Sequence, residues 1–219
     1  MRAPRAGTLA VLKLTLFVVC LVPLARLVWA ANRGALGANP VEFVTRATGW
    51  WTLALLFATL VITPLRRVTG AYWVVKLRRM LGLFVFFYAA VHFMTYIWLD
   101  VWFDLAAVAR DILKRPFITV GFTALVLLLP LALTSTSAMQ RRLGRAWPRL
   151  HRIVYAIALL GVLHFWWLVK RDITEPLSFA LAYVVLMAMR VKTFPARKLG
   201  ENPPRRTDES RHPDATPIE

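Results

Sequence analysis

Three of the four histidines in this chain, His92, His151 and His164, lie inside or at the edge of apolar segments, whereas His212 lies in a polar one. An imidazole within a lipid bilayer is energetically costly, and it commonly marks metal ligation or proton transfer. Neutral imidazole is also a common axial ligand of haem iron. These three residues are therefore the first candidates for chemistry.

Two of these histidines are expected to lie at a similar depth. His92 precedes the end of its apolar segment at Leu99 by about 10 Å of helix, and His164 precedes the end of its own segment at Val169 by about 7–8 Å. If both segments run towards the same side of a membrane, the two imidazoles can bind one iron from opposite faces. We predict that His92 and His164 are the axial ligands of a b-type haem.

His151 has two interpretations that the sequence leaves open. It precedes His164 by about 20 Å of helix and points about 140° away from it on an ideal helix. It could ligate a second, inner haem, or it could be an interfacial histidine among arginines. The segment that carries His92 has Arg78 and Arg79 where a second inner ligand would be needed.

Other functions remain as alternatives to haem binding. Membrane histidines often only hydrogen-bond to a neighbouring helix. They could also form a relay in a proton channel or small transporter, but such a relay needs further polar groups, and few besides Tyr155 lie between His151 and His164. A cytochrome b that anchors a different redox partner is a further alternative.

The elements that position these histidines are six apolar runs, each approaching the length of about 20 residues that crosses a hydrocarbon core. We therefore predict an all-α integral membrane protein, a six-helix transmembrane bundle whose first run is retained rather than cleaved as a signal peptide. The runs are Leu9–Ala30, Thr48–Pro64, Met80–Leu99, Phe117–Thr134, Ile153–Val169 and Pro176–Met189.

The net charge of +17 would suit a nucleic-acid partner, but the distribution of the charges favours a lipid bilayer. If the N-terminus is inside, 20 of the 28 Lys and Arg residues lie on the inner side. This is the positive-inside pattern with both termini cytoplasmic. We predict a cytoplasmic N-terminus over residues 1–8, the transmembrane domain over 9–192, and a polar, proline-containing cytoplasmic tail over 193–219 that is disordered.

Several short motifs resemble one family of membrane proteins. Thr48-Gly49-Trp50-Trp51 leads into Thr63-Pro64-Leu65-Arg66, and Arg79-Met80-Leu81-Gly82-Leu83 leads into His92-Phe93. Leu150-His151-Arg152-Ile153-Val154-Tyr155, followed by His164-Phe165-Trp166-Trp167, is the most specific part. Over roughly residues 10–192 the chain resembles the haem-binding membrane subunits of bacterial protein-methionine-sulfoxide reductase systems, the MsrQ family.

The resemblance implies a ferric-reductase-like domain in the bacterial inner membrane, with haem b and an FMN. In such proteins four histidines usually hold two stacked haems, and this chain matches three of them. The resemblance further implies that electrons pass from the respiratory quinone pool to a separate periplasmic molybdopterin reductase. That partner would be the enzyme that repairs oxidised methionine, and this chain would be an electron-transfer subunit. Asp100, Asp104 and Asp111 are candidates for docking the partner.

Overall fold

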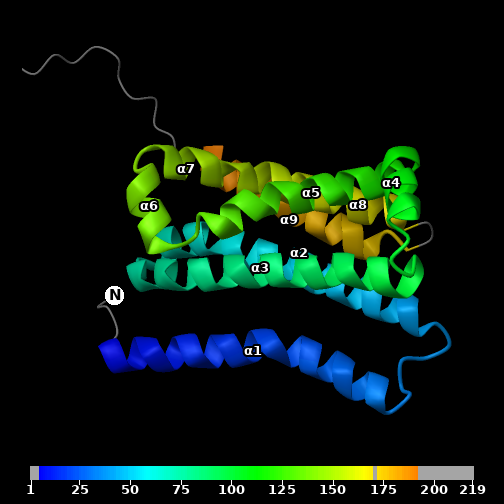
Figure 1. Cartoon of the computed structure of the whole chain (residues 1–219). Coiled ribbons are helices and arrows are strands. Elements are labelled where there is room, and N and C mark those ends of the chain that lie inside the picture. The colour runs from blue at the N-terminus through cyan, green and yellow to red at the C-terminus, as the bar shows by residue number, and fades with distance from the viewer. Residues whose placement is uncertain (1–4, 170–171, 192–219) are drawn as a thin grey trace, which may run out of the picture.

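The structure, a computed structural model, describes residues 5–169 and 172–191, and every regular element in this part is helical. Figure 1 shows the long helices lying side by side along one common direction. They are α1 (Ala6–Asn32), α2 (Pro40–Thr69), α3 (Val75–Thr95), α5 (Pro116–Leu133), α8 (Val154–Leu168) and α9 (Thr174–Val191). The short ones are η1 (Tyr72–Val74), a π-helical turn η2 (Tyr96–Asp100), α4 (Leu105–Lys114), α6 (Ser137–Leu143), α7 (Ala146–Leu150) and η3 (His151–Ile153).

Each of the six predicted apolar runs falls on one long helix. Five helical stretches in the described residues are long and apolar enough to cross a bilayer, and α9 is an 18-residue helix that packs against α2 and α8. The predicted tail over 193–219 and residues 1–4 lie outside the described residues. The described chain begins and ends at the same end of the bundle (Figure 1).

The second long helix is well delimited by local sequence. Pro40 occupies its first turn, where a missing N–H costs nothing, and the Asn39 side chain accepts a hydrogen bond from the Glu42 amide at 3.2 Å. The helix ends at Gly70, whose φ of +67° suits glycine. Helix α2 therefore extends beyond the predicted apolar run Thr48–Pro64 at both ends, because capping residues rather than hydropathy set its boundaries.

Helix α2 lies at the centre of the bundle, and half of its most apolar window is buried. It contacts α1, α3, α8 and α9, while α5 packs mainly on α8. Large apolar side chains on α1 are mostly exposed, as expected for a surface that faces lipid rather than water. Most of the fully buried side chains come from α2, α3 and α8, and Pro176 of α9 joins them: Thr48, Leu60, Val85, Tyr88, Ile157, Ala158 and Pro176.

The first helix is attached through Tyr88 of α3, which is fully buried. The Tyr88 hydroxyl donates to the Cys20 carbonyl at 2.7 Å and accepts from the Leu24 amide at 3.2 Å. An unbroken α-helix would pair that amide with that carbonyl. Because Pro23 lies inside α1, this side chain satisfies backbone groups at the point where proline disturbs the helix.

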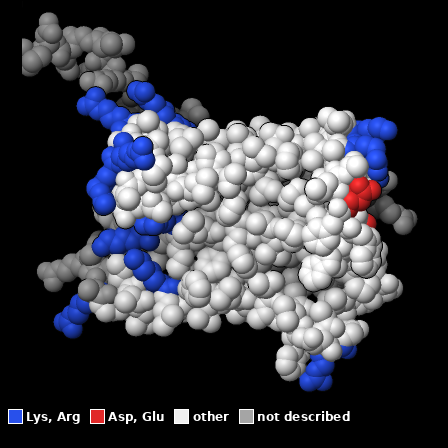
Figure 2. Space-filling view, in the orientation of Figure 1, with Lys and Arg blue, Asp and Glu red and all other residues white. Residues whose placement is uncertain are grey.

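The two ends of the bundle differ in charge, and Figure 2 shows an almost uncharged middle between them. Lys and Arg gather at the end that holds the start of α1 together with α6 and α7, and the acidic residues visible on this face lie at the opposite end. No Asp or Glu occurs between residues 43 and 99 or between 112 and 171. The uncharged band has the character of a surface that contacts the hydrocarbon core.

The acidic end also carries α4, a short amphipathic helix that the apolar runs did not predict. It follows the π-helical turn η2 and two exposed aromatic residues, Trp102 and Phe103, with φ values of 51° and 60°. Positive φ at two successive bulky residues is uncommon and turns the chain sharply. The Asp104 side chain then accepts from the Ala107 amide at 2.9 Å and starts α4.

Candidate functional site

The structure brings His92 and His164 together, as their predicted depths required. His92 extends from α3 and His164 from α8, and their ring centroids lie 6.1 Å apart with the ring planes at 77°. The two residues are 72 positions apart in the sequence, so only the packing of helices places them face to face. The site thus presents two imidazoles from opposite sides of one space.

Each imidazole is held by a backbone carbonyl of a neighbouring helix. His92 Nδ1 lies 2.9 Å from the Thr45 carbonyl oxygen in α2, and His164 Nδ1 lies 2.6 Å from that of Phe117 in α5. A carbonyl can only accept, so Nδ1 carries the proton in each ring and donates it. The other nitrogen, Nε2, then has its lone pair available for a metal.

Two glycines make room for the two rings. A Cβ atom at Gly121 of α5 would lie 2.7 Å from His164 Nδ1, and one at Gly49 of α2 would lie 3.0 Å from His92 Cε1. A side chain at position 121 would therefore force the His164 ring to shift, and one at position 49 would press on the His92 ring, which would have to give by a few tenths of an ångström. Each imidazole is therefore fixed by the same pair of features, a carbonyl and a glycine on one adjacent helix.

Both histidines line a cavity of about 350 Å³ between α2, α3, α5 and α8. This volume is within the range of roughly 300–1,000 Å³ that is usual for small-molecule and cofactor sites. Polar groups lie at the end of the cavity nearest the acidic end of the bundle, where Thr45, Arg46, Tyr96, Asp100 and Arg115 contribute to its wall. Elsewhere the wall is largely apolar and includes Leu53, Leu56, Ala89, Leu125, Leu128 and Ile157.

The site fits a haem better than a metal bound by protein alone. Metal sites formed only by side chains usually use three or four ligands, and the described residues contain no group of three or more His, Cys, Asp or Glu that could hold an ion. Two metal–nitrogen bonds of about 2 Å, with the distance from each ring centre to its nitrogen, add up to roughly the observed centroid separation. The porphyrin would supply the other ligands of the iron.

His151 lies away from this cavity, in the turn η3 between α7 and α8. Its ring stacks on Trp147 with centroids 4.0 Å apart, and its Nδ1 lies 3.2 Å from the Trp147 carbonyl oxygen. Nε2 is buried and has no hydrogen-bond partner among the described residues. The helix that was expected to be continuous from His151 to His164 is interrupted by the 3₁₀ turn, so ideal helical rotation does not relate the two.

The acidic residues expected at a docking surface are partly engaged within the chain. Asp104 caps α4 and lies 3.6 Å from Arg110, and Asp111 accepts from the Tyr96 hydroxyl at 2.8 Å. Asp111 also pairs with Arg115 at 3.1 Å. These two carboxylates therefore form contacts within the acidic end of the bundle, and any role in docking a partner would be additional.

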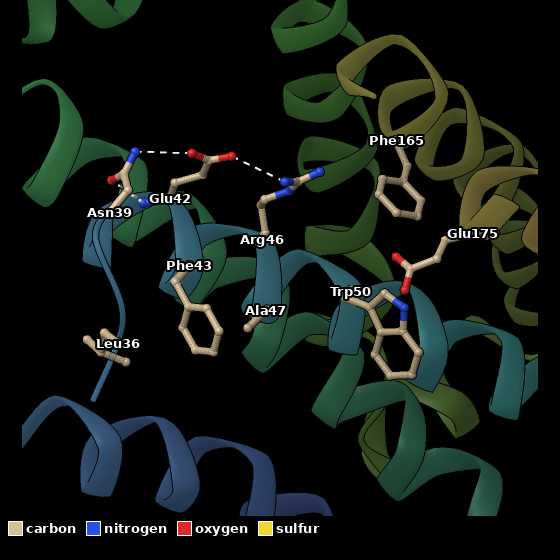
Figure 3. A pocket seen from close by; sticks show the side chains of 9 residues that line it. All are labelled: Leu36, Asn39, Glu42, Phe43, Arg46, Ala47, Trp50, Phe165 and Glu175. Atoms are coloured by element: carbon tan, nitrogen blue, oxygen red, sulfur yellow. Dashed lines mark hydrogen bonds and ion pairs between the residues drawn. The ribbon is translucent and has the colours of Figure 1, made fainter. Parts of the chain in front are cut away.

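A second hollow of about 440 Å³ adjoins the cavity at the same end. Figure 3 shows it between the start of α2 and the side chains of Phe165 and Glu175. Arg46, Trp50 and Phe165 line both spaces, so they separate this open hollow from the cavity that contains the histidines.

Sequence reasoning found the facing histidines but missed what orients them. Gly49 appeared in a motif without a role, and Gly121, Arg46 and Arg115 were not singled out. The carbonyls of Thr45 and Phe117 carry no sequence signal, because every residue has one. The spacing did offer a signal for the glycines, since Gly49 and Gly121 lie four residues beyond Thr45 and Phe117, one turn along the same helix face.

The chain is similar to known membrane proteins over most of its length. Residues 48–162 match the family described as ferric reductase like transmembrane component, a range that includes His92 and His151 and ends two residues before His164. The protein-methionine-sulfoxide reductase heme-binding subunit MsrQ of Herminiimonas arsenicoxydans is 51% identical over 191 residues, 86% of this chain and 88% of that protein. The subunits of the same name from Bordetella pertussis and Xanthomonas campestris are 49% and 47% identical and cover 85% and 90% of this chain and 92% and 93% of their own lengths.

Proposed function

Because this chain belongs to the MsrQ family of haem-binding subunits of protein-methionine-sulfoxide reductases, within the ferric-reductase-like transmembrane proteins, we propose that it transfers electrons across the bacterial inner membrane through a haem b held by His92 and His164. The observation that carries the proposal is the pair of imidazoles with centroids 6.1 Å apart in a cavity between four helices. We assign the reduction of the sulfoxide to a separate catalytic subunit, because the relatives are named as heme-binding subunits of a reductase.

The residues of this chain bind and insulate the cofactor. Thr45 and Phe117 accept the Nδ1 protons, which keeps both imidazoles neutral donors through Nε2. The apolar wall excludes water and thereby helps to set the reduction potential. When bound, the haem supplies reversible one-electron chemistry. Its place near the acidic end of the bundle suits delivery to a partner on the periplasmic side.

The rest of the route rests on the family. We propose the respiratory quinone pool as the electron source, a periplasmic molybdopterin reductase as the acceptor, and FMN as a further cofactor. No residue of this chain is assigned to the quinone or to the flavin. For His151 we keep both interpretations, a ligand of a second haem or an interfacial histidine stacked on Trp147.

The test is the absorbance of histidine variants. We expect His92→Ala and His164→Ala each to lose the reduced b-type spectrum at an equal level of purified protein. Because the two ring planes lie at 77°, we also expect the oxidised wild-type protein to give a strongly anisotropic low-spin electron paramagnetic resonance signal. His212→Ala, which changes a histidine of the polar C-terminal segment, is the matched control and should keep both signals.

Four outcomes separate the proposals. Normal spectra in both His92→Ala and His164→Ala would remove the ligand assignment, and a colourless wild-type protein made with haem available would favour a proton relay. A lower ratio of iron to protein in His151→Ala, with the signal of the outer haem retained, would identify a second haem. An unchanged ratio would leave His151 as an interfacial residue.

A further inference from the structure

The outer end of the haem cavity carries two cations on different helices. Arg46 lies in the first half of α2, and Arg115 immediately precedes α5. Among the described residues that line this cavity, they are the only Lys or Arg, and Asp100 is the only Asp or Glu. Each of the two side chains is 54% exposed, so the cations lie at the open rim of an otherwise apolar wall, where they stay partly hydrated.

Arg46 is held in place by two side chains of its own helix region. Figure 3 shows the network: Asn39 Nδ2 donates to the Glu42 carboxylate at 3.1 Å, and Arg46 Nη1 pairs with the other oxygen of Glu42 at 3.2 Å. Glu42 lies one helical turn before Arg46, so the pair follows the surface of α2. One edge of the guanidinium is thereby fixed, and a different edge can meet a further anion.

Arg115 is oriented by the same kind of arrangement on the other side. Its Nε pairs with Asp111, again four residues earlier, at 3.1 Å, and the Tyr96 hydroxyl donates to the second oxygen of that carboxylate at 2.8 Å. Because Nε is the atom engaged, the two terminal nitrogens extend beyond the pair. A guanidinium used in this way can still bind a second carboxylate through two parallel hydrogen bonds.

The opposite end of the cavity offers nothing to an anion. Its wall there is formed by Leu56, Leu128 and Ile157, which lie towards the inner ends of α2, α5 and α8. A haem carries two propionate carboxylates on one edge, and placing that edge among these side chains would leave two charges unpaired in an apolar medium. The two propionates and the two arginines therefore match in number and in position, and each guanidinium would bridge its present carboxylate partner and one propionate.

We propose that Arg46 and Arg115 bind the two propionates of the haem and so fix its rotation, with the propionate edge towards the outer end of the bundle. This inference rests on the proposed function, since it requires a haem between His92 and His164. It assigns two binding residues that the histidine pattern could not reveal. It also places charge and hydrogen-bond donors, rather than bare porphyrin, at the edge nearest an external partner.

The experiment compares haem b with its dimethyl ester, which has the same ring and iron but no propionate charge. The full-length apoprotein is titrated with each compound in detergent, and the Arg46→Gln/Arg115→Gln double variant is treated identically. We expect the wild type to bind haem roughly tenfold to a hundredfold tighter than the ester, as for hydrogen bonds to charged groups. In the double variant we expect nearly equal affinities, together with a lower midpoint potential of bound haem, because lost positive charge favours the ferric state.

Arg110→Gln is the matched control, because Arg110 pairs with Asp104 at the same end but does not line the cavity. It should keep the wild-type preference. Each single Gln variant should lose part of the preference and each Lys variant should retain more of it, so the test stands even if the double variant is unstable.

A double variant that discriminates as strongly as the wild type would overturn the propionate assignment. A wild type that binds neither compound would instead refute haem binding itself.

Discussion

At the scale of single residues, the site depends on a repeated local arrangement. Each facing imidazole donates to a carbonyl on a neighbouring helix and rests on a glycine one turn further along that helix. His92 uses Thr45 and Gly49, and His164 uses Phe117 and Gly121. When Nδ1 is fixed in this way, the orientation of the ring is set and Nε2 is left to bind a metal. No other protein group is needed to hold the ring in place.

We predict that Gly121→Ala weakens haem binding without unfolding the bundle. The added methyl group would lie 2.7 Å from His164 Nδ1, so the ring must turn away and lose its bond to the Phe117 carbonyl. We expect the affinity for haem to fall by about tenfold to a hundredfold, as is common when the second shell of a metal ligand is removed. Haem titration of the apoprotein measures the effect.

Gly82→Ala is the control for this prediction, because nothing lies within 4 Å of a Cβ atom at Gly82 of α3. It should bind haem as the wild type does. If Gly121→Ala and Gly82→Ala bound haem equally well, the contact between Gly121 and the imidazole would not determine the ligand geometry.

At the scale of elements, a buried arginine compensates for a proline in the central helix. Pro64 of α2 has no N–H for the Leu60 carbonyl, and Arg190 of α9 donates to that carbonyl through Nη2 at 2.6 Å. The same guanidinium lies over the Tyr155 ring of α8, 5.0 Å from its centroid. One side chain thus joins three helices at the end of the bundle opposite Arg46 and Arg115.

The Leu60 contact can be measured with a double-mutant cycle. We expect Arg190→Met to lower the free energy of unfolding by about 1.5–3 kcal/mol, the usual effect of losing a hydrogen bond to a charged group. Pro64→Ala restores an N–H to the helix, so the same arginine substitution should cost about 1 kcal/mol less in that background. Unfolding by denaturing detergent, followed by circular dichroism, gives the four stabilities.

Loss of the other Arg190 contacts, including the one with Tyr155, is common to both backgrounds and cancels in the cycle. If Arg190→Met lowered the free energy of unfolding equally in both backgrounds, the hydrogen bond from Arg190 to the Leu60 carbonyl would not depend on Pro64.

At the scale of the whole molecule, the charge distribution predicts how the bundle is oriented in the membrane. Lys and Arg dominate the end that holds the start of α1, while the acidic residues of the described chain lie in segments at the other end. The histidine pair and both cavity arginines belong to the acidic end. The orientation of the bundle therefore decides on which side of the membrane the histidine pair, and any haem it binds, would lie.

We predict that both termini are cytoplasmic and that the haem lies towards the periplasm. Reporter fusions at the N-terminus and after residue 219 should be active only as cytoplasmic reporters, because positively charged segments are retained inside. Reporters inserted near Gly37 and near Trp102, in the connections at the opposite end, should be active only as periplasmic ones. The reverse pattern at all four sites would invert the proposed direction of electron transfer.

The sequence by itself determined the helical class, the apolar runs and the pair of histidines. Hydropathy and helical rise are local properties, so they located the six long helices and gave His92 and His164 similar depths. They did not locate α4, because a short amphipathic helix has no long apolar run, nor the 3₁₀ turn at His151, which departs from ideal helical geometry.

Only the tertiary structure decided which groups meet. The carbonyls of Thr45 and Phe117, the space at Gly49 and Gly121, and the positions of Arg46 and Arg115 acquire their roles through contacts between helices that are distant in sequence. A carbonyl or a missing side chain has no chemistry of its own to read in a sequence. It becomes part of a site when packing places a specific imidazole against it, and that depends on the whole bundle.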